Sequence, residues 1–360
     1  MSLAIVGAGL SGLAAAYALK GAPPRVTVFE KSRGVSGRAA TRRRDGVCYD
    51  HGANHFKTKS KQLRSFVCES LPSDDLAEID GDVWTFGAGG EIREGDPDRN
   101  AETKWTYRDG VSRLGKHLAE TAGVEPHFET RVTLLTQDDG HGANGSVWTL
   151  TDAEGHQHGP FEAVLLTPPA PQTVDLLKAS RLDEALQERL IEGLAPATYR
   201  TQLTLVLAYR RRIERPPGCY ALLNDDGDHE IAWLGFEEEK PGHVPDDHAT
   251  IESLLVAQMA PGWSRPRFRS ELGALVPEVT TLVGGLLDVD ARRPRWADRQ
   301  GWRYALPTAA ADAEALEDAG PEAGIFFAGD ALEGAGRVGK ALQSGLRTGE
   351  RLRRFFGVRE

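Results

Sequence analysis

Hydrophobic positions at the start of the chain predict a strand, a tight turn, a helix and a second strand. Residues 2–6 (SLAIV) form an apolar run with the length of a buried strand, and residues 25–31 (RVTVFEK) predict another strand that ends in Glu30. Between them, residues 10–19 repeat their apolar positions at helical spacing. The residues that would share one face of this helix are Leu10, Leu13, Ala14, Tyr17 and Ala18. This order of elements indicates the beginning of a doubly wound α/β domain.

The other end of the chain predicts a matching strand and helix. Residues 324–352 contain a short apolar run, Asp330 at its end, a glycine-rich turn and a long final helix. A sheet that is completed by the last strand and helix of the chain is typical of flavoproteins. We therefore expect both ends of the chain to build one domain.

The middle of the chain predicts mostly antiparallel sheet. Residues 130–169 predict a meander of three strands that ends at Thr167. Because two prolines follow and prevent a straight continuation, we expect the chain to leave there for a second domain. The elements predicted for that domain are strands over 201–209, 229–236 and 249–258, a helix over 270–287 and a hairpin over 82–94.

The glycines of the first turn predict a dinucleotide site. Gly7 permits the tight turn, Gly9 lets the backbone approach a pyrophosphate, and Gly12 allows close packing of helix on strand. Glu30, at the end of the second strand, suits a free ribose 2′-hydroxyl and would repel a 2′-phosphate. The pattern therefore favours FAD or NAD over NADP.

Two further segments favour FAD over NAD. A loop with two glycines and Arg38 follows Glu30, where the arginine can approach a second flank of the phosphates. Asp330 can accept hydrogen bonds from ribityl hydroxyls, and the N-terminus of the last helix would face the pyrimidine edge of the flavin. The alternative for Asp330 is a plain turn residue. No cysteine follows Cys219, so we expect noncovalent FAD.

Composition and charge limit the classes of partner that the chain is expected to bind. The chain of 360 residues has a formal net charge of -10 and no long Lys/Arg run, which argues against nucleic acid or an anionic membrane as a partner. The three cysteines (Cys48, Cys68, Cys219) are widely spaced, so neither disulfides nor a metal site is predicted and a cytoplasmic location fits. The sequence leaves the oligomeric state open.

Several motifs together resemble the renalase-like branch of the FAD-dependent amine oxidase superfamily. They are GAGLSGLAAA (7–16), VFEKSRGVSGRAATRR (28–43), DHGANHF (50–56), TPPAPQ (167–172), WRYALP (302–307), FAGD (327–330) and GRVGKALQSG (336–345). The resemblance implies an α/β fold of the glutathione-reductase and amine-oxidase type: a Rossmann-like FAD-binding domain and a second α+β substrate domain built on an antiparallel sheet. We expect the FAD domain to comprise 1–57, 106–171 and 301–360, and the substrate domain 58–105 and 172–300.

The resemblance also implies site residues. Cofactor contacts are expected from Gly7, Gly9, Ser11, Gly12, Glu30, Gly37, Arg38, Gly52, Ala53, Asn54, Val132, Gly329, Asp330 and Val338. Catalytic roles beside the flavin ring are expected from Asn54, His55, Trp302 and Tyr304. Trp233 is another aromatic candidate; any of these tryptophans equally suits a core, and His55 equally suits a structural role.

The sequence departs from the family pattern mainly around the substrate. Ser36 stands where a glycine is usual, Asn54 replaces a glutamine, and Gln300 and Gly301 replace a His-Arg pair. Gly339 lies in an altered start of the last helix. The resemblance is therefore stronger for the flavin than for the substrate.

Three functions follow as hypotheses. The first is a renalase-like oxidase that takes hydride from isomeric dihydronicotinamide dinucleotides and passes electrons to oxygen. The second is an amine oxidase or desaturase of the same superfamily. The third is a flavin-binding protein without turnover.

Overall fold

The computed structural model describes residues 1–140 and 146–357, which form two compact units. Unit 1 comprises Met1–Arg38, Leu114–Tyr199 and Leu306–Glu360, and unit 2 comprises Ala39–Arg113 and Arg200–Ala305. These boundaries differ from the expected ones in four segments: 39–57, 106–113 and 301–305 lie in unit 2, and 172–199 lies in unit 1.

Unit 1 is built on the predicted Rossmann-like parallel sheet. Its strands, in the order β18-β12-β1-β2, are β18 (Ile325–Phe327), β12 (Ala163–Leu166), β1 (Ser2–Val6) and β2 (Arg25–Phe29). The register aligns Val6 with both Phe29 and Leu166, and Leu166 with Phe327. All four strands therefore end at one edge of the sheet, where ligands bind in open α/β folds.

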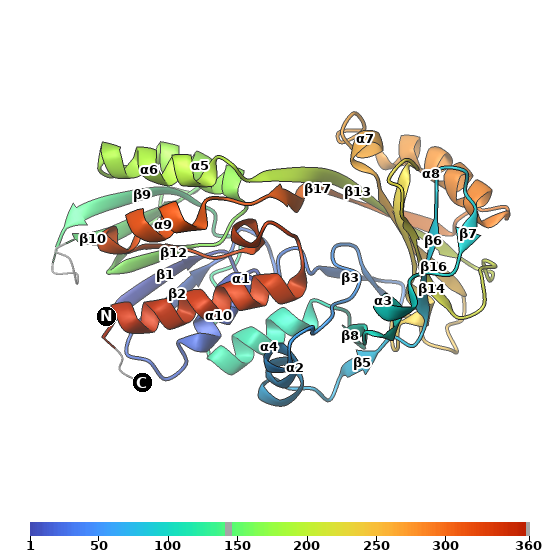
Figure 1. Ribbon diagram of the computed structural model, residues 1–360, viewed down its shortest axis with the longest axis horizontal. Coiled ribbons are helices and arrows are strands. Elements are labelled where there is room, and N and C mark those ends of the chain that lie inside the picture. The colour runs from blue at the N-terminus through green and yellow to red at the C-terminus, as the bar shows by residue number, and fades with distance from the viewer. Residues whose placement is uncertain (141–145, 358–360) are drawn as a thin grey trace. The chain divides into compact units, whose positions relative to one another are not determined.

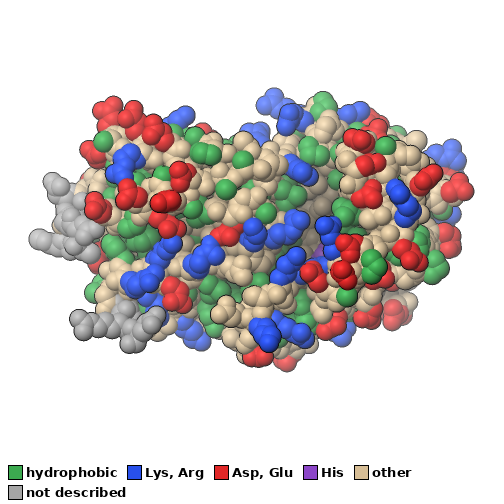
Figure 2. Space-filling view, in the orientation of Figure 1, with side chains coloured by type: hydrophobic (Ala, Val, Ile, Leu, Met, Phe, Trp, Pro, Cys, Tyr) green, Lys and Arg blue, Asp and Glu red, His purple; other side chains and the backbone are tan. Residues whose placement is uncertain are grey.

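Helices α1 (Leu10–Ala18) and α10 (Val338–Phe355) lie side by side in unit 1 (Figure 1). A Cβ atom at Gly345 would lie 2.2 Å from the Ser11 carbonyl oxygen, and one at Gly349 would lie 2.5 Å from the Ala18 Cβ. These glycines let the two backbones approach closely. Lys and Arg side chains follow the opposite, outward surface of α10 (Figure 2).

The region predicted as a three-stranded meander contains four strands. Strands β9 (Val132–Asp139), β10 (Ser146–Asp152) and β11 (Gln157–Phe161) pair antiparallel. The final apolar run is a separate strand, β12, which is buried along its whole length between β1 and β18. Such uninterrupted burial is typical of a central parallel strand.

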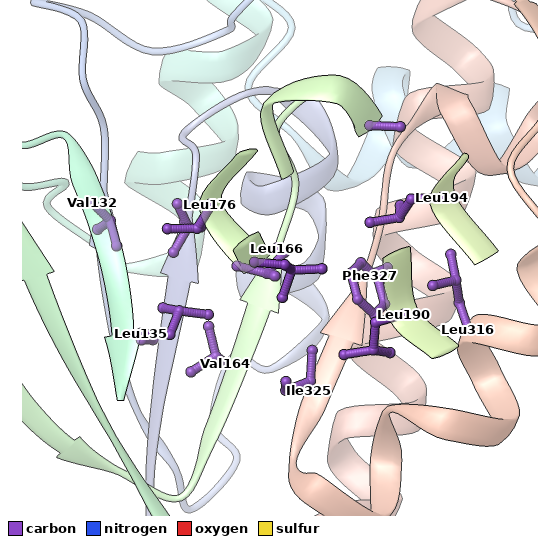
Figure 3. Packing of buried hydrophobic residues seen from close by; sticks show 14 of the residues in the cluster. Val132, Leu135, Val164, Leu166, Leu176, Leu190, Leu194, Leu316, Ile325 and Phe327 are labelled. Carbon is purple, nitrogen blue, oxygen red and sulfur yellow. The ribbon is translucent and has the colours of Figure 1, made fainter. Parts of the chain in front are cut away.

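The expectation that the chain leaves unit 1 after Pro169 is wrong. Helix α5 (Ala170–Ala179) begins directly after that proline, because proline is well tolerated at the start of a helix. Helices α6 (Glu184–Leu194) and α9 (Ala313–Ala319) follow in the same unit. Figure 3 shows their leucines packed against the ends of β12 and β18 in a core that includes Leu176, Leu190, Leu194, Leu316, Leu166 and Phe327. Burial of these leucines keeps 172–199 in unit 1.

Unit 2 is built on a seven-stranded sheet. Its order is β17 (Trp296–Ala309), β13 (Thr198–Tyr209), β16 (Ser253–Met259), β15 (Ile231–Phe236), β14 (Cys219–Asn224), β6 (Asp82–Phe86) and β7 (Ile92–Arg93). The pairs among β13 to β16 are antiparallel, as predicted, whereas β6 and β14 pair parallel. Helix α8 (Leu272–Leu287) packs on this sheet through Leu275, Val279, Val283 and Leu286.

The hairpin of β3 (Thr41–Arg44) and β4 (Val47–Asp50) belongs to unit 2. Val47 and Tyr49 pack in one buried cluster with Val206, Leu254 and Val256 of the large sheet. This packing explains why residues 39–57 join unit 2 instead of the predicted FAD domain.

The remaining elements are short. They are α2 (Lys61–Ser65), η1 (Phe66–Ser70), β5 (Leu76–Glu78), α3 (Pro97–Ala101), β8 (Trp105–Tyr107), α4 (Arg113–Ala122), η2 (Glu237–Glu239), α7 (Pro261–Ser264), η3 (Pro321–Ala323) and η4 (Asp330–Glu333). Among the helices of residues 1–140 and 146–357, none combines the length and the apolar character needed to cross a membrane.

Candidate functional site

The glycine turn of unit 1 forms an open cradle at the start of α1. Gly7 has a φ of +106°, and a Cβ there would lie 2.4 Å from the Thr167 hydroxyl oxygen. A Cβ at Gly12 would lie 2.2 Å from the Gly7 carbonyl oxygen. The protein itself therefore requires these two glycines.

Gly9 differs from both, because a Cβ there would meet no protein atom within 4 Å. Its φ of -73° is open to any residue, and α1 begins after it without a side-chain cap. The missing side chain and the uncapped N–H groups leave room and hydrogen-bond donors for a pyrophosphate. This geometry fits the expected dinucleotide.

Glu30 is held at the carboxyl end of β2 beside this cradle. Its two carboxylate oxygens accept hydrogen bonds from the backbone N–H groups of Ala8 (2.9 Å) and Ser32 (2.8 Å). A carboxylate can accept about four hydrogen bonds, so it retains acceptor positions for ribose hydroxyls.

Arg38 and Asp330 were expected to touch different parts of the cofactor, and the structure brings them together. Arg38 donates a hydrogen bond of 2.7 Å to the Asp330 carboxylate. The segment before Arg38 is fixed by the N–H of Ser36, which donates to the Ala8 carbonyl over 2.8 Å. A Cβ at Gly37 would lie 3.2 Å from the Gly9 Cα, so the loop closes over the glycine turn.

The C-terminal part of unit 1 offers a second uncapped helix start. The Gly329 N–H donates to the Ser344 hydroxyl over 3.0 Å, which ties the Asp330 turn to α10. Val338 is the first residue of α10, and the preceding Arg337 provides no side-chain cap. These first-turn N–H groups can stabilise negative charge, as expected for the pyrimidine edge of a flavin.

The other expected cofactor residues are placed as follows. Ser11 is buried in α1, and Val132 begins β9 with its side chain in the core shown in Figure 3. Gly52, Ala53 and Asn54 belong to unit 2, in the segment that follows β4.

A buried cluster of charges anchors that segment. The charge cluster consists of Asp50, Glu237, Lys240 and His243, whose side chains have no exposed surface. The Lys240 ammonium lies 2.9 Å from Asp50 and 2.7 Å from Glu237, and His243 Nδ1 lies 2.8 Å from Glu237. Asp50 also accepts hydrogen bonds from the Thr41 hydroxyl and the Val111 N–H.

Each charge in the cluster is stabilised by its neighbours. Burial alone would lower the pKa of His243, but the carboxylates of Asp50 and Glu237 outweigh it and raise that pKa to about 10. Burial would likewise raise the pKa of Asp50, but Lys240 and His243 hold it below its ordinary value. Asp50, Glu237 and His243 are spaced for a metal ion, yet the Lys240 ammonium already binds both carboxylates. This cluster was not predicted from the sequence; its signals were Asp50 at the start of the DHGANHF motif and Lys240 in a KPG motif after Trp233.

The aromatic candidates divide into two groups. Trp302, on β17, stacks on His51 with ring centroids 5.5 Å apart, and its Nε1 donates to the His51 carbonyl over 2.9 Å. His55 instead lies against Trp233 and Tyr220, each at a centroid distance of 5.8 Å. Tyr304 is half-buried two residues beyond Trp302 on the same strand.

Gln300 and Gly301, which depart from the family pattern, each lie against a neighbouring side chain. Arg42 donates to the side chains of both Asp298 (2.8 Å) and Gln300 (2.5 Å). A Cβ at Gly301 would lie 3.1 Å from the Phe268 ring, on the core side of β17. Gln300 thus belongs to a polar network beside Trp302.

Replacing Lys240 with methionine should destabilise the protein strongly. The loss of one partner would leave buried carboxylates without compensation, which costs about 3–5 kcal/mol of the free energy of unfolding. Urea unfolding of Lys240→Met measures this cost. Lys59→Met is the matched control, because its ion pair with Glu102 is 78% exposed on the lysine side and should contribute less than about 1 kcal/mol. Equal losses in the two variants would show that the charge cluster does not hold unit 2 together.

Replacing Gly9 with valine should remove FAD without unfolding the protein. The new side chain meets no protein atom near its Cβ but fills the space kept for the pyrophosphate. Acid precipitation of wild-type protein should release about one FAD per chain, and Gly9→Val should release almost none. Unfolding curves should superimpose once both proteins are freed of FAD; a wild-type FAD content in Gly9→Val would contradict the assignment of the cradle.

Comparison with known proteins agrees with this geometry. A family described as flavin containing amine oxidoreductase matches residues 74–353, and a family described as NAD(P)-binding Rossmann-like domain matches residues 5–69. An L-amino-acid oxidase of Sistrurus catenatus edwardsii is 37% identical over 83 residues, which are 23% of this chain and 16% of that relative. The aligned stretch thus covers only a small part of the relative's length.

Two solved structures share the fold over nearly the whole chain. Putrescine oxidase bound to putrescine aligns with a TM-score of 0.72 and 16% identity over 98% of this chain and 99% of that one. Cyclohexylamine oxidase from Brevibacterium oxydans IH-35A aligns with a TM-score of 0.72 and 13% identity over 98% of both chains. Since the family match spans 74–353, the chain belongs to the flavin-containing amine oxidoreductase family.

Proposed function

We propose that this protein is an FAD-dependent oxidoreductase that takes a hydride from isomeric dihydronicotinamide dinucleotides and uses oxygen as the electron acceptor. The resemblance of its cofactor motifs to the renalase-like branch supports this substrate class. We also propose a cytoplasmic location, which the three free cysteines support.

The observation that carries the proposal is that His51 is neutral and that the carboxylates near segment 51–55 are already paired. Burial, assisted by the charge of Arg42, lowers the pKa of His51 to about 4, so this imidazole is uncharged at neutral pH. The Asp298 carboxylate is held by Arg42, and the charge cluster is closed within itself. A dihydropyridine gives up hydride without prior deprotonation, whereas an ammonium substrate must first lose a proton. The neutral surroundings therefore favour the dihydropyridine.

The bound FAD would supply the two-electron acceptor for this reaction. In the overall reaction, the dihydronicotinamide loses a hydride and becomes an aromatic cation. Oxygen gains two electrons and two protons, one of them from solvent, and becomes hydrogen peroxide.

The chain's own residues bind and orient the reactants. We propose that unit 1 holds the dinucleotide through its glycine turn, Glu30, Arg38, Asp330 and the start of α10. In unit 2, Asn54 and His55 would contact the substrate, and the rings of Trp302 and Tyr304 would exclude water and stack on a flat substrate. Aromatic contact with the cationic product contributes about 0.5–2 kcal/mol.

Amine oxidation is the second candidate function. It is favoured by the fold shared with a putrescine oxidase and by the local identity to an L-amino-acid oxidase. It would require a group in unit 2 that accepts the ammonium proton.

Anaerobic stopped-flow absorbance tests the choice of substrate. We expect the flavin to be reduced by 2- or 6-dihydronicotinamide dinucleotides at least about tenfold faster than by ordinary 4-dihydro NADH or by simple primary amines, because the resemblance to the renalase-like branch implies the isomers as hydride donors. Oxygen consumption with matching peroxide release checks the acceptor.

Two other results of this experiment would each support a different function. Preferential bleaching by an amine would favour amine oxidation. A flavin that no donor reduces would indicate a binding protein without turnover.

A further inference from the structure

We propose that Asn54 and Trp233, which both lie beside Gly235, form a recognition site for a primary carboxamide. The inference rests on the proposed function, since the nicotinamide ring carries such a carboxamide. It specifies which group of the substrate unit 2 recognises, namely the carboxamide, and which residues recognise that group.

Two buried polar atoms in this part of unit 2 lack partners. Asn54 Oδ1 and Trp233 Nε1 each expose less than 1 Å² and make no hydrogen bond within the described residues. Asn54 as a whole is only 9% exposed. Because a buried polar atom without a partner is costly, an acceptor and a donor left open in this way indicate a ligand.

Both unpaired atoms lie close to Gly235, against which the Trp233 indole packs. A Cβ at Gly235 would lie 2.9 Å from Trp233 Nε1 and 3.9 Å from Asn54 Oδ1. Gly235 lies inside β15, paired with Ala221 and Val256, and its backbone is not in a conformation that needs glycine. A glycine inside a strand often marks a place where a ligand comes close.

The neighbouring groups fix the two partners in place. The Tyr220 hydroxyl donates a 3.2 Å hydrogen bond to the main-chain carbonyl oxygen of Asn54, not to its side chain. Tyr220 and Trp233 also pack together, with ring centroids 6.0 Å apart, and His55 lies against both. Asn54 and the Trp233 indole are thus held by the fold instead of by a bound group.

A primary carboxamide satisfies both open atoms at once. Its carbonyl oxygen accepts from the Trp233 indole N–H, and its amide N–H donates to Asn54 Oδ1. An ammonium group offers only donors, and a carboxylate or ketone offers only acceptors, so each would leave one of the two atoms unpaired. The site therefore selects against substrates that lack the amide.

Binding of NAD+, the oxidised product, tests the carboxamide site independently of the reaction. Calorimetry on the FAD-loaded protein should show NAD+ binding about tenfold more tightly than its 3-acetylpyridine analogue, which lacks the N–H donor. Asn54→Ala should bring the two dissociation constants to within about twofold of each other, because the acceptor for that N–H is gone. Trp233→Phe should weaken binding of both dinucleotides about tenfold, because the donor is lost. Gly235→Ala should have a similar effect, because the new Cβ would lie 2.9 Å from Trp233 Nε1 and displace the donor.

The control is Trp84→Phe, a half-buried tryptophan on β6 of the same unit, which should change neither constant. An unchanged preference for NAD+ in Asn54→Ala would overturn the carboxamide site while leaving the proposed substrate in place. If wild-type protein binds neither dinucleotide and the isomers do not reduce its flavin, the proposed function fails and the inference fails with it.

Discussion

The close approach of α10 to α1 is the constraint on which unit 1 depends. With glycines at 345 and 349, backbone meets backbone, so the last helix of the chain lies against the first. This contact brings the Asp330 turn to the glycine turn, where Arg38 binds Asp330. Two uncapped helix starts, at Gly9 and at Val338, then belong to the same unit. A single dinucleotide can be held from both ends of the chain only because of this packing.

In unit 2, the buried charge cluster fixes the position of the candidate substrate residues. Asp50 pairs with Lys240 inside the charge cluster and accepts hydrogen bonds from Thr41 and Val111, and the segment 51–55 begins directly after it. Such a cluster adds little net stability compared with apolar packing, but removing one member is costly. It therefore specifies one position for the backbone that carries Asn54 and His55.

The sequence predicted the cofactor region better than the substrate region, for physical reasons. A turn such as Gly7–Gly12 is local, so its glycine spacing reveals it together with the flanking strands, the helix and Glu30. The charge cluster joins residues nearly 200 positions apart, from Asp50 to His243, and no local pattern reports such a contact. Pro169 was misinterpreted because proline both ends strands and begins helices, and the buried leucines of α5 and α6 decide between these. Trp302 was grouped with His55, but in the fold it stacks on His51.

Exchanging single glycines for alanine tests the central claim most directly, namely that α1 and α10 together form the FAD site. In exposed helix positions such as Gly285, where a Cβ meets nothing within 4 Å, alanine should stabilise the protein by about 0.5–1 kcal/mol. At Gly345 the same change places a Cβ 2.2 Å from a backbone oxygen of α1. The account predicts that Gly345→Ala lowers both the free energy of unfolding and the affinity for FAD, while Gly285→Ala leaves FAD affinity unchanged. A Gly345→Ala protein that binds FAD as tightly as wild type would contradict it.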